Sequence, residues 1–236
     1  MEITVDIKPT GVESAIVYAP FDIAKKALEN KGYRIISLEE NAKLRIQQGK
    51  GSYISKNGNR TREAVIYLPD KRIILTKNSP IMENPKEATT AYRNGNEYFL
   101  TNEQVEQALQ DSVSLSGKAI PTNDFKNNEI TNFAFGDIAE NYGLFLKNAG
   151  INKMPVYLAN VSNKPFARQM WFRNLGSYSE LNGYGRGLGS GGRMRGVSEK
   201  TSEAGSEILY SEKQISKALK SMGLSGLEKS LIAKLK

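Results

Sequence analysis

The glycine-rich segment GYGRGLGSGGRMRGV, residues 183–197, most constrains how this chain can fold. Eight of the chain's 21 glycines lie between Gly176 and Gly196, a density typical of a flexible linker. Apolar residues nevertheless recur through the segment, and a buried apolar side chain anchors a loop by about 1.5 to 3 kcal/mol. We therefore expect anchored loops between short strands rather than an RNA-binding linker. The expected anchors are Trp171, Leu175, Leu181, Leu188, Met194 and Val197, with Arg186, Arg193 and Arg195 among them.

The positions between these anchors use a restricted set of residue types. They carry Tyr, Ser, Gly and Asn, which binding loops favour because Tyr gives a large amphipathic contact area and the others give adaptable polar contacts. A plain surface loop is the alternative. The candidate ligand-binding positions are Asn174, Ser177, Tyr178, Asn182, Tyr184, Gly185, Gly187, Gly189, Ser190, Gly191 and Gly192.

The chain contains no Cys and no His among its 236 residues. Disulfides, thiolate chemistry, imidazole bases and the usual zinc ligands are therefore excluded. The remaining catalytic residue types form no pair at a diagnostic spacing. The strongest carboxylate candidates, Asp137 and Glu140, match the start of a helix that they would cap and solvate. We therefore expect a protein that is not an enzyme and that binds no metal and no cofactor.

The net charge of +8 is unevenly distributed. Residues 164–198 hold six Lys and Arg against Glu180 alone, and residues 212–236 hold six Lys against two Glu. Such basic regions suit an acidic or nucleic-acid partner, or simply solubilise a loop and a tail. Nucleic-acid binding through the Arg/Gly stretch and the Lys-rich tail therefore stands as the alternative function.

The ends and the hydropathy of the chain indicate its location. No apolar run reaches the roughly 20 residues of a membrane span, and the start MEITVDIKPTG lacks the regions of a secretory signal. These features predict a cytoplasmic protein without a membrane span. A position on a virion or on the cell surface remains open.

Periodicity and capping signals predict alternating strands and helices. Helices are expected over residues 21–32, after the capping boxes that begin at Ser37 and Thr101, between Pro85 and Gly95, and over 136–150. Residues 49–62 are turn-rich, and residues 62–78 should form a hairpin around PDK. The other expected strands are 2–7, 14–19, 33–36, 154–160 and 166–172.

The segment after Val197 differs from the rest of the chain. A polar spacer leads to two short amphipathic helices, which begin at the capping boxes of Ser211 and Ser225. We therefore expect a domain over residues 1–198, followed by a spacer and a basic helical hairpin over 199–236.

Several segments together resemble a known family. The run ARQMWFRNLGSYSELNGYGRGLGSGGRMRGV resembles the variable region of archaeal proteins that are diversified by diversity-generating retroelements. The closing GGRMRGV is similar to the G-x-R-x-x-R type of last strand in their fold, and GYRIISLEENAKL resembles its early strand-to-helix segment. The resemblance covers residues 33–198.

This resemblance implies a C-type-lectin fold related to formylglycine-generating enzymes. The fold class is α+β, with a small antiparallel sheet, flanking helices and long loops, and the variable region spans about 168–197. The implied function is non-enzymatic binding of a ligand, a protein or another macromolecule, by a surface that adenine-directed mutagenic retrohoming diversifies. The chain lacks the cysteines of the sulfatase-activating relatives and the EPN and WND motifs of calcium-dependent lectins, so neither activity is implied.

The resemblance also sorts the residues of the variable region. Altering the first two bases of an Asn codon yields Tyr, Ser, Gly, Asp or His, but not Met, Glu, Gln, Lys or Trp. Tyr178 and Tyr184 are therefore implied contact residues, whereas Met170, Glu180 and Met194 belong to the framework. The implied scaffold of the site consists of Trp171, Leu175, Leu181, Arg186, Leu188, Arg193 and Arg195.

Overall fold

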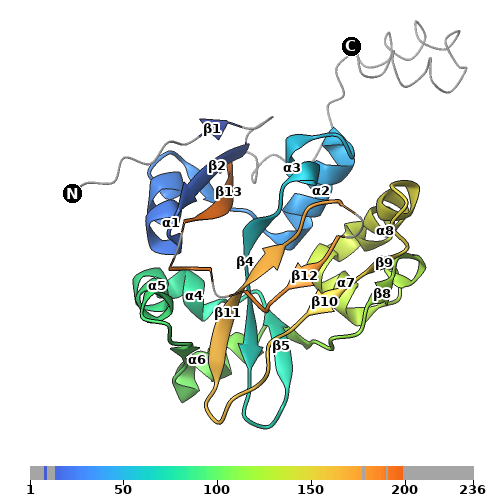
Figure 1. Cartoon of the computed structure of the whole chain (residues 1–236). Coiled ribbons are helices and arrows are strands. Elements are labelled where there is room, and N and C mark those ends of the chain that lie inside the picture. Colours follow the sequence, from blue (N-terminus) through green and yellow to red (C-terminus); the bar gives the residue numbers. More distant parts are fainter. Residues whose placement is uncertain (1–7, 10–13, 177–178, 186, 190, 199–236) are drawn as a thin grey trace, which may run out of the picture. The chain divides into compact units, whose positions relative to one another are not determined.

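The computed structural model of the chain describes residues 8–9, 14–176, 179–185, 187–189 and 191–198 (Figure 1). Several predictions fall on other residues and are not addressed by it. These are the strand at 2–7, the tail over 199–236 with its two helices, and the site residues Ser177, Tyr178, Arg186 and Ser190.

Two long strands, β4 (Asn59–Tyr67) and β11 (Phe166–Phe172), pair antiparallel in the middle of the main sheet. Their register shifts between Gln169 and Trp171, which marks a bulge. The last described strand, β13 (Gly192–Ser198), pairs antiparallel with β2 (Ser14–Ala19) and β3 (Tyr33–Ile35), and touches β4 in parallel. The sheet is completed by β1 (Lys8–Pro9), β5 (Ile73–Thr76), β6 (Tyr98–Phe99), β7 (Ser112–Ser114), β10 (Val156–Tyr157) and β12 (Leu181–Asn182).

The central strands bury side chains on both faces. In β4, Val65 and Tyr67 enter one hydrophobic cluster, while the alternating Ala64 and Ile66 enter another. Figure 1 shows α1, α4 and α5 on one side of the β4 and β11 pair, with α7 and α8 on the other. The sheet is therefore a layer between two cores, and loops at its ends rest on a rigid base.

Two helices begin at the capping boxes that the sequence predicts. Ser37 and Thr101 both form complete capping boxes, with Glu40 and Gln104 as the reciprocal partners. Gly32, which follows the first helix, has a φ of 74°, a conformation that favours glycine. The helices are α1 (Phe21–Glu29), α2 (Leu38–Gln48), α3 (Tyr53–Lys56), α4 (Pro80–Glu83), α5 (Pro85–Arg93), α6 (Asn102–Leu109), α7 (Glu129–Phe135) and α8 (Ala139–Asn148).

Three sequence expectations were wrong in detail. The helix expected over 136–150 is a 3-10 turn over Gly136–Ile138 followed by α8. The turn-rich segment 49–62 contains α3, because the Ser52 side chain accepts a hydrogen bond from the backbone of Ser55 and so caps a helix. The single strand expected over 154–160 is instead β9 (Lys153–Met154), which pairs with β8 (Ile120–Pro121), and the separate β10. Pro155, which has no N–H to donate, stands between them. The predicted α+β class is confirmed.

Candidate functional site

A surface pocket of about 320 Å³ lies where β4 and β11 meet the segment between β12 and β13. Four predicted ligand-binding positions line it, together with two predicted scaffold residues and two residues that the sequence did not single out. Gln169 and Trp171 face the pocket from β11, alternating with Met170 and Phe172, which face a core. The lining residues are Arg60, Gln169, Trp171, Asn182, Gly185, Gly187, Leu188 and Gly191.

Arg45 of α2, which is completely buried, holds the segment that follows β11. Its Nη1 donates to the hydroxyl oxygens of Tyr142, at 3.0 Å, and Ser179, at 3.2 Å. Its Nη2 donates to the carbonyl of Arg173 at 2.8 Å. The guanidinium carbon also lies 4.0 Å from the ring centroid of Phe172. One arginine thus holds both Arg173 and Ser179.

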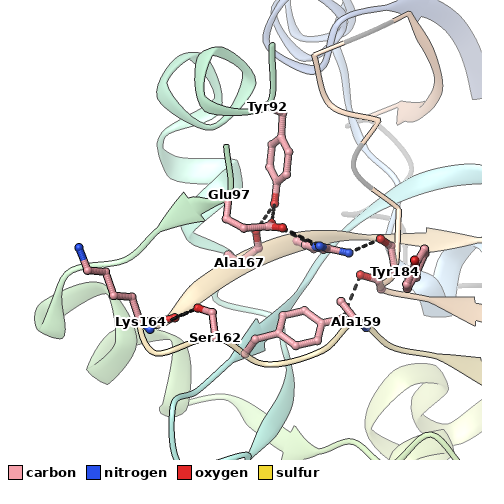
Figure 2. Close-up of polar contacts among 10 residues, drawn as sticks. Tyr92, Glu97, Ala159, Ser162, Lys164, Ala167 and Tyr184 are labelled. Atoms are coloured by element: carbon pink, nitrogen blue, oxygen red, sulfur yellow. Dashed lines mark hydrogen bonds and ion pairs between the residues drawn. The ribbon is translucent and has the colours of Figure 1, made fainter. Parts of the chain in front are cut away.

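A second buried arginine, Arg168, holds the chain at Tyr184. Its Nη1 donates to the carbonyl of Tyr184, while Nη2 pairs with Oε1 of Glu97 at 2.6 Å. The Tyr92 hydroxyl donates to Oε2 of the same carboxylate at 3.3 Å (Figure 2). Burial lowers the pKa of Arg168, but the hydrogen bond and charge of Glu97 outweigh it and leave that pKa above its usual value. The cation is therefore securely paired.

The centre of the segment is fixed by main-chain contacts. The Tyr67 hydroxyl donates to the carbonyl of Gly183 at 2.9 Å, and the backbone N–H of Phe21 donates to the carbonyl of Leu188 at 3.0 Å. The side chains of Leu181 and Leu188 are buried. In the part of the chain that the structure describes, the glycine-rich segment is therefore anchored as a folded loop would be.

The glycines of the segment differ in the space around them. A side chain at Gly185 or Gly191 would meet nothing within 4 Å. A Cβ at Gly189 would lie only 2.7 Å from the backbone nitrogen of Arg93, and one at Gly192 would overlap a guanidinium. The packing therefore favours variation at Gly185 and Gly191 and disfavours it at Gly189 and Gly192.

The polar candidates also differ in their freedom. Tyr184 is 64% exposed, as a contact residue must be. Asn182 is half-buried, because its Oδ1 accepts from the Tyr184 backbone and its Nδ2 donates to Oε1 of the buried Glu180, each at 2.9 Å. Asn174 is half-buried, and Leu175 is buried beside it.

The two arginine side chains of β13 are buried or packed against other side chains of the domain. Arg195 is completely buried, and burial lowers its pKa to about 10. The guanidinium of Arg193 lies over the ring of Tyr18, 5.0 Å from its centroid, and donates to its hydroxyl. Such residues suit a scaffold better than a clamp on phosphates, which needs accessible cations.

The residues that sequence reasoning missed come from distant elements. Arg45 lies seven residues after Leu38, on the apolar face of α2, where a charged residue indicates a buried partner. The carboxylate of Glu97 and the hydroxyl of Tyr67 carried no such local signal.

The residues considered for catalysis lie elsewhere. Asp137 precedes α8, and Glu140 is in its first turn, where it forms an exposed ion pair with Lys126 at 3.1 Å. Within the described ranges, no group of three acidic side chains could hold a metal ion, and no helix is long and apolar enough to cross a membrane.

The two-core sheet and the anchored loops define a protein with the C-type lectin fold. This chain is similar to a solved structure described as "Accommodation of massive sequence variation in Nanoarchaeota by the C-type lectin fold". The TM-score is 0.58 and the sequence identity 15%, over 82% of this chain and 99% of that chain. The likeness confirms the predicted fold. No protein-family model and no curated protein matches the sequence.

Proposed function

We propose that this chain is a non-enzymatic ligand-binding protein whose surface pocket is diversified by a diversity-generating retroelement through adenine-directed mutagenic retrohoming. The observation that carries the proposal is the pocket itself. It is lined by Asn182, Gly185, Gly187 and Gly191, which are predicted to vary and form the rim in this proposal, and by Arg60, Gln169, Trp171 and Leu188. The similarity to a C-type-lectin-fold structure described for its massive sequence variation supports it.

The way in which the segment is anchored supports tolerance of sequence change. The long-range hydrogen bonds to it end largely on main-chain carbonyls, those of Arg173, Gly183, Tyr184, Leu188 and Gly189. A carbonyl oxygen accepts the same bond whichever side chain its residue carries. Exchanging the side chain of Tyr184, for example, removes no acceptor from the Arg168 clamp. The scaffold therefore needs little from the residues that vary.

The ligand that fits such a surface is a protein or another macromolecule. Exposed Tyr184 gives a large amphipathic contact beside a concave pocket, and the neighbouring Gly185 and Gly191 leave room for further side chains. Aromatic anchors within a polar rim carry much of the binding energy of protein interfaces.

Two matched libraries test the proposal. One randomises Asn182, Tyr184, Gly185 and Gly191, and the control randomises the buried Leu175, Leu181, Leu188 and Met194. We expect most members of the first library to fold and to differ in the partners that they select, whereas most members of the control fail to fold. Equal tolerance in both libraries would contradict the proposal.

The flanking DNA supplies an independent test. A near-identical repeat that differs at adenines, beside a reverse-transcriptase gene, is the expected finding. Steeply salt-dependent binding of RNA or DNA that is lost on removing residues 199–236 would instead support the nucleic-acid alternative.

A further inference from the structure

The pocket contains a buried cation that the diversified positions do not supply. Arg60 of β4 is 5% exposed, and its Nη1 is buried without a hydrogen-bond partner among the described residues. Its guanidinium lies against Gly192, where a Cβ would overlap it. Burial alone lowers the pKa of Arg60 to about 10, which leaves the group charged at neutral pH.

Among the described residues, no carboxylate lines the pocket to balance this charge. Two other buried arginines are better satisfied: Arg168 pairs with Glu97, and Arg45 donates to three oxygens, although its Nε has no partner among the described residues. Buried charges in proteins are normally paired or hydrogen-bonded. An unbalanced guanidinium in the wall of an open pocket therefore indicates an anionic group that enters from outside.

An unused acceptor lies in the same pocket. The Nε2 of Gln169 donates to the carbonyls of Thr61 and Glu63, the latter at 3.0 Å, and this pair of acceptors fixes which end of the amide is nitrogen. The Oε1 of Gln169 is buried and has no partner within the described part of the chain. Two residues that line the pocket, Arg60 and Gln169, thus each have a buried polar atom without a partner among the described residues.

The remaining walls are apolar or small. The half-buried Trp171 and the buried Leu188 offer apolar surface, and Gly185, Gly187 and Gly191 leave the mouth open. A planar anionic group with an adjacent N–H and a short apolar side chain suits such a lining.

We propose that this pocket binds a carboxylate that stands next to an N–H donor on a polypeptide, with Arg60 holding the carboxylate and Gln169 accepting from the N–H. The proposal rests on the proposed function and deepens it, since it names the chemical class that the site recognises. A polypeptide offers this group at its C-terminus and, with a longer spacing, at an Asp side chain. Arg60 lies outside the variable region, and an Asn codon does not yield Gln. Diversified versions of the surface would therefore share one carboxylate anchor and differ in the rim around it.

The single tryptophan of the chain provides the assay, because it lines the pocket. Selective excitation of Trp171 reports titrations of the full chain with N-acetylglycine, a mimic of a C-terminus, and with N-acetylaspartic acid amide, a mimic of a side chain. N-acetylglycinamide removes the charge, and acetate removes the N–H. We expect N-acetylglycine to bind at least about tenfold more tightly than either of these two controls. Tighter binding of the aspartyl probe would assign the side-chain source, and equal responses to all four probes would overturn the proposal.

Two variants act on the pocket by different routes. Arg60→Met removes the cation and should abolish the preference for N-acetylglycine over its amide. Gly191→Glu adds a carboxylate to the pocket at a position where the Cβ would have no atom within 4 Å. It should weaken the binding of N-acetylglycine about tenfold or more. Gly117→Glu is the matched control, because Gly117 has room for a Cβ and lies outside the pocket, and it should bind like the wild type. Unchanged binding in both pocket variants would refute the assignment.

The two proposals fail separately. If members of the rim library select different partners while Arg60→Met leaves carboxylate binding intact, the result supports the diversified function and refutes the carboxylate site. If Arg60→Met abolishes carboxylate binding while substitutions in the rim leave the selected partners unchanged, the result supports the carboxylate site and refutes the diversified function.

Discussion

Replacing the buried Arg60 by methionine should make the protein more stable, because it removes a buried charge. The guanidinium is charged, 5% exposed and without a hydrogen-bond partner at Nη1 among the described residues. Methionine keeps an unbranched apolar stem of similar length and removes the charge. Replacing buried charges by apolar residues of similar volume is often stabilising.

The magnitude follows from the pKa of Arg60, which burial lowers from 12.5 to about 10. A shift of this size corresponds to roughly 3 kcal/mol by which folding disfavours the charged form. Below pH 10 the arginine is charged in the folded and unfolded states alike, so the whole penalty is present at neutral pH. As the pH rises through the folded pKa, the folded state releases the proton and the penalty shrinks. Arg60→Met should therefore raise the free energy of unfolding by about 2 to 3 kcal/mol between pH 6 and 9.

Urea unfolding and thermal melts of the two proteins measure this difference. A gain of 2 to 3 kcal/mol corresponds to roughly 4 to 12 °C in the melting temperature of a domain of this size. Saturating N-acetylglycine should raise the melting temperature of the wild type and leave that of the variant unchanged. A variant less stable than the wild type at pH 7, or a difference that does not shrink above pH 10, would refute the reasoning.

Four further substitutions test the framework. Gly189→Ala should cost about 1 to 3 kcal/mol, because its Cβ meets a backbone nitrogen at 2.7 Å, whereas the matched Gly191→Ala, with open space, should stay within about 0.5 kcal/mol of the wild type in urea unfolding. Glu97→Gln should destabilise the fold by about 3 kcal/mol, since it leaves the buried Arg168 cation without its ion pair, and a loss below 1 kcal/mol would contradict that role. Burial raises the pKa of Glu63, so the folded state keeps its proton above the ordinary value of 4.5 and the wild type loses stability as the pH rises past that value. Glu63→Gln should therefore gain stability over the wild type at pH 7, and pH-dependent melts should show the gain vanish below pH 4.

Local signals in the sequence predicted five of the helices and several strands, but not α3, α4 and α7 or the short strands β6, β7, β8 and β12. The capping boxes at Ser37 and Thr101 begin helices because their bonds are formed within four residues. The stripe through Tyr142 and Leu146 packs into a core because its spacing matches a helix turn. The strand over 14–19 was equally readable from its residue types.

The sequence could not predict which elements hold the loop. Arg45 and Ser179 are 134 positions apart, and Arg168 and Glu97 are 71 apart, so no pattern within a window links them. The space at Gly189 depends on the main chain of Arg93 in α5, so the composition of the loop does not indicate it. That Nη1 of Arg60 has no partner among the described residues likewise depends on how β4 packs beside the segment between β12 and β13. Which glycines have room for a side chain is thus a property of packing.

The pairing of β13 with β2 has a consequence for the synthesis of the protein. Arg195 of β13 donates to Ser14 at the start of β2 across 181 positions of sequence, so an inner strand of the sheet is synthesised long after the strand that it pairs with. At 5 to 20 residues per second, β2 waits roughly 9 to 36 s for its partner. During that time its apolar SAIVYA segment is without the neighbour that covers its edge, and such edges aggregate readily. Folding therefore includes a slow, non-local closure of the sheet, and substitutions that delay the pairing of β13 with β2 should increase aggregation.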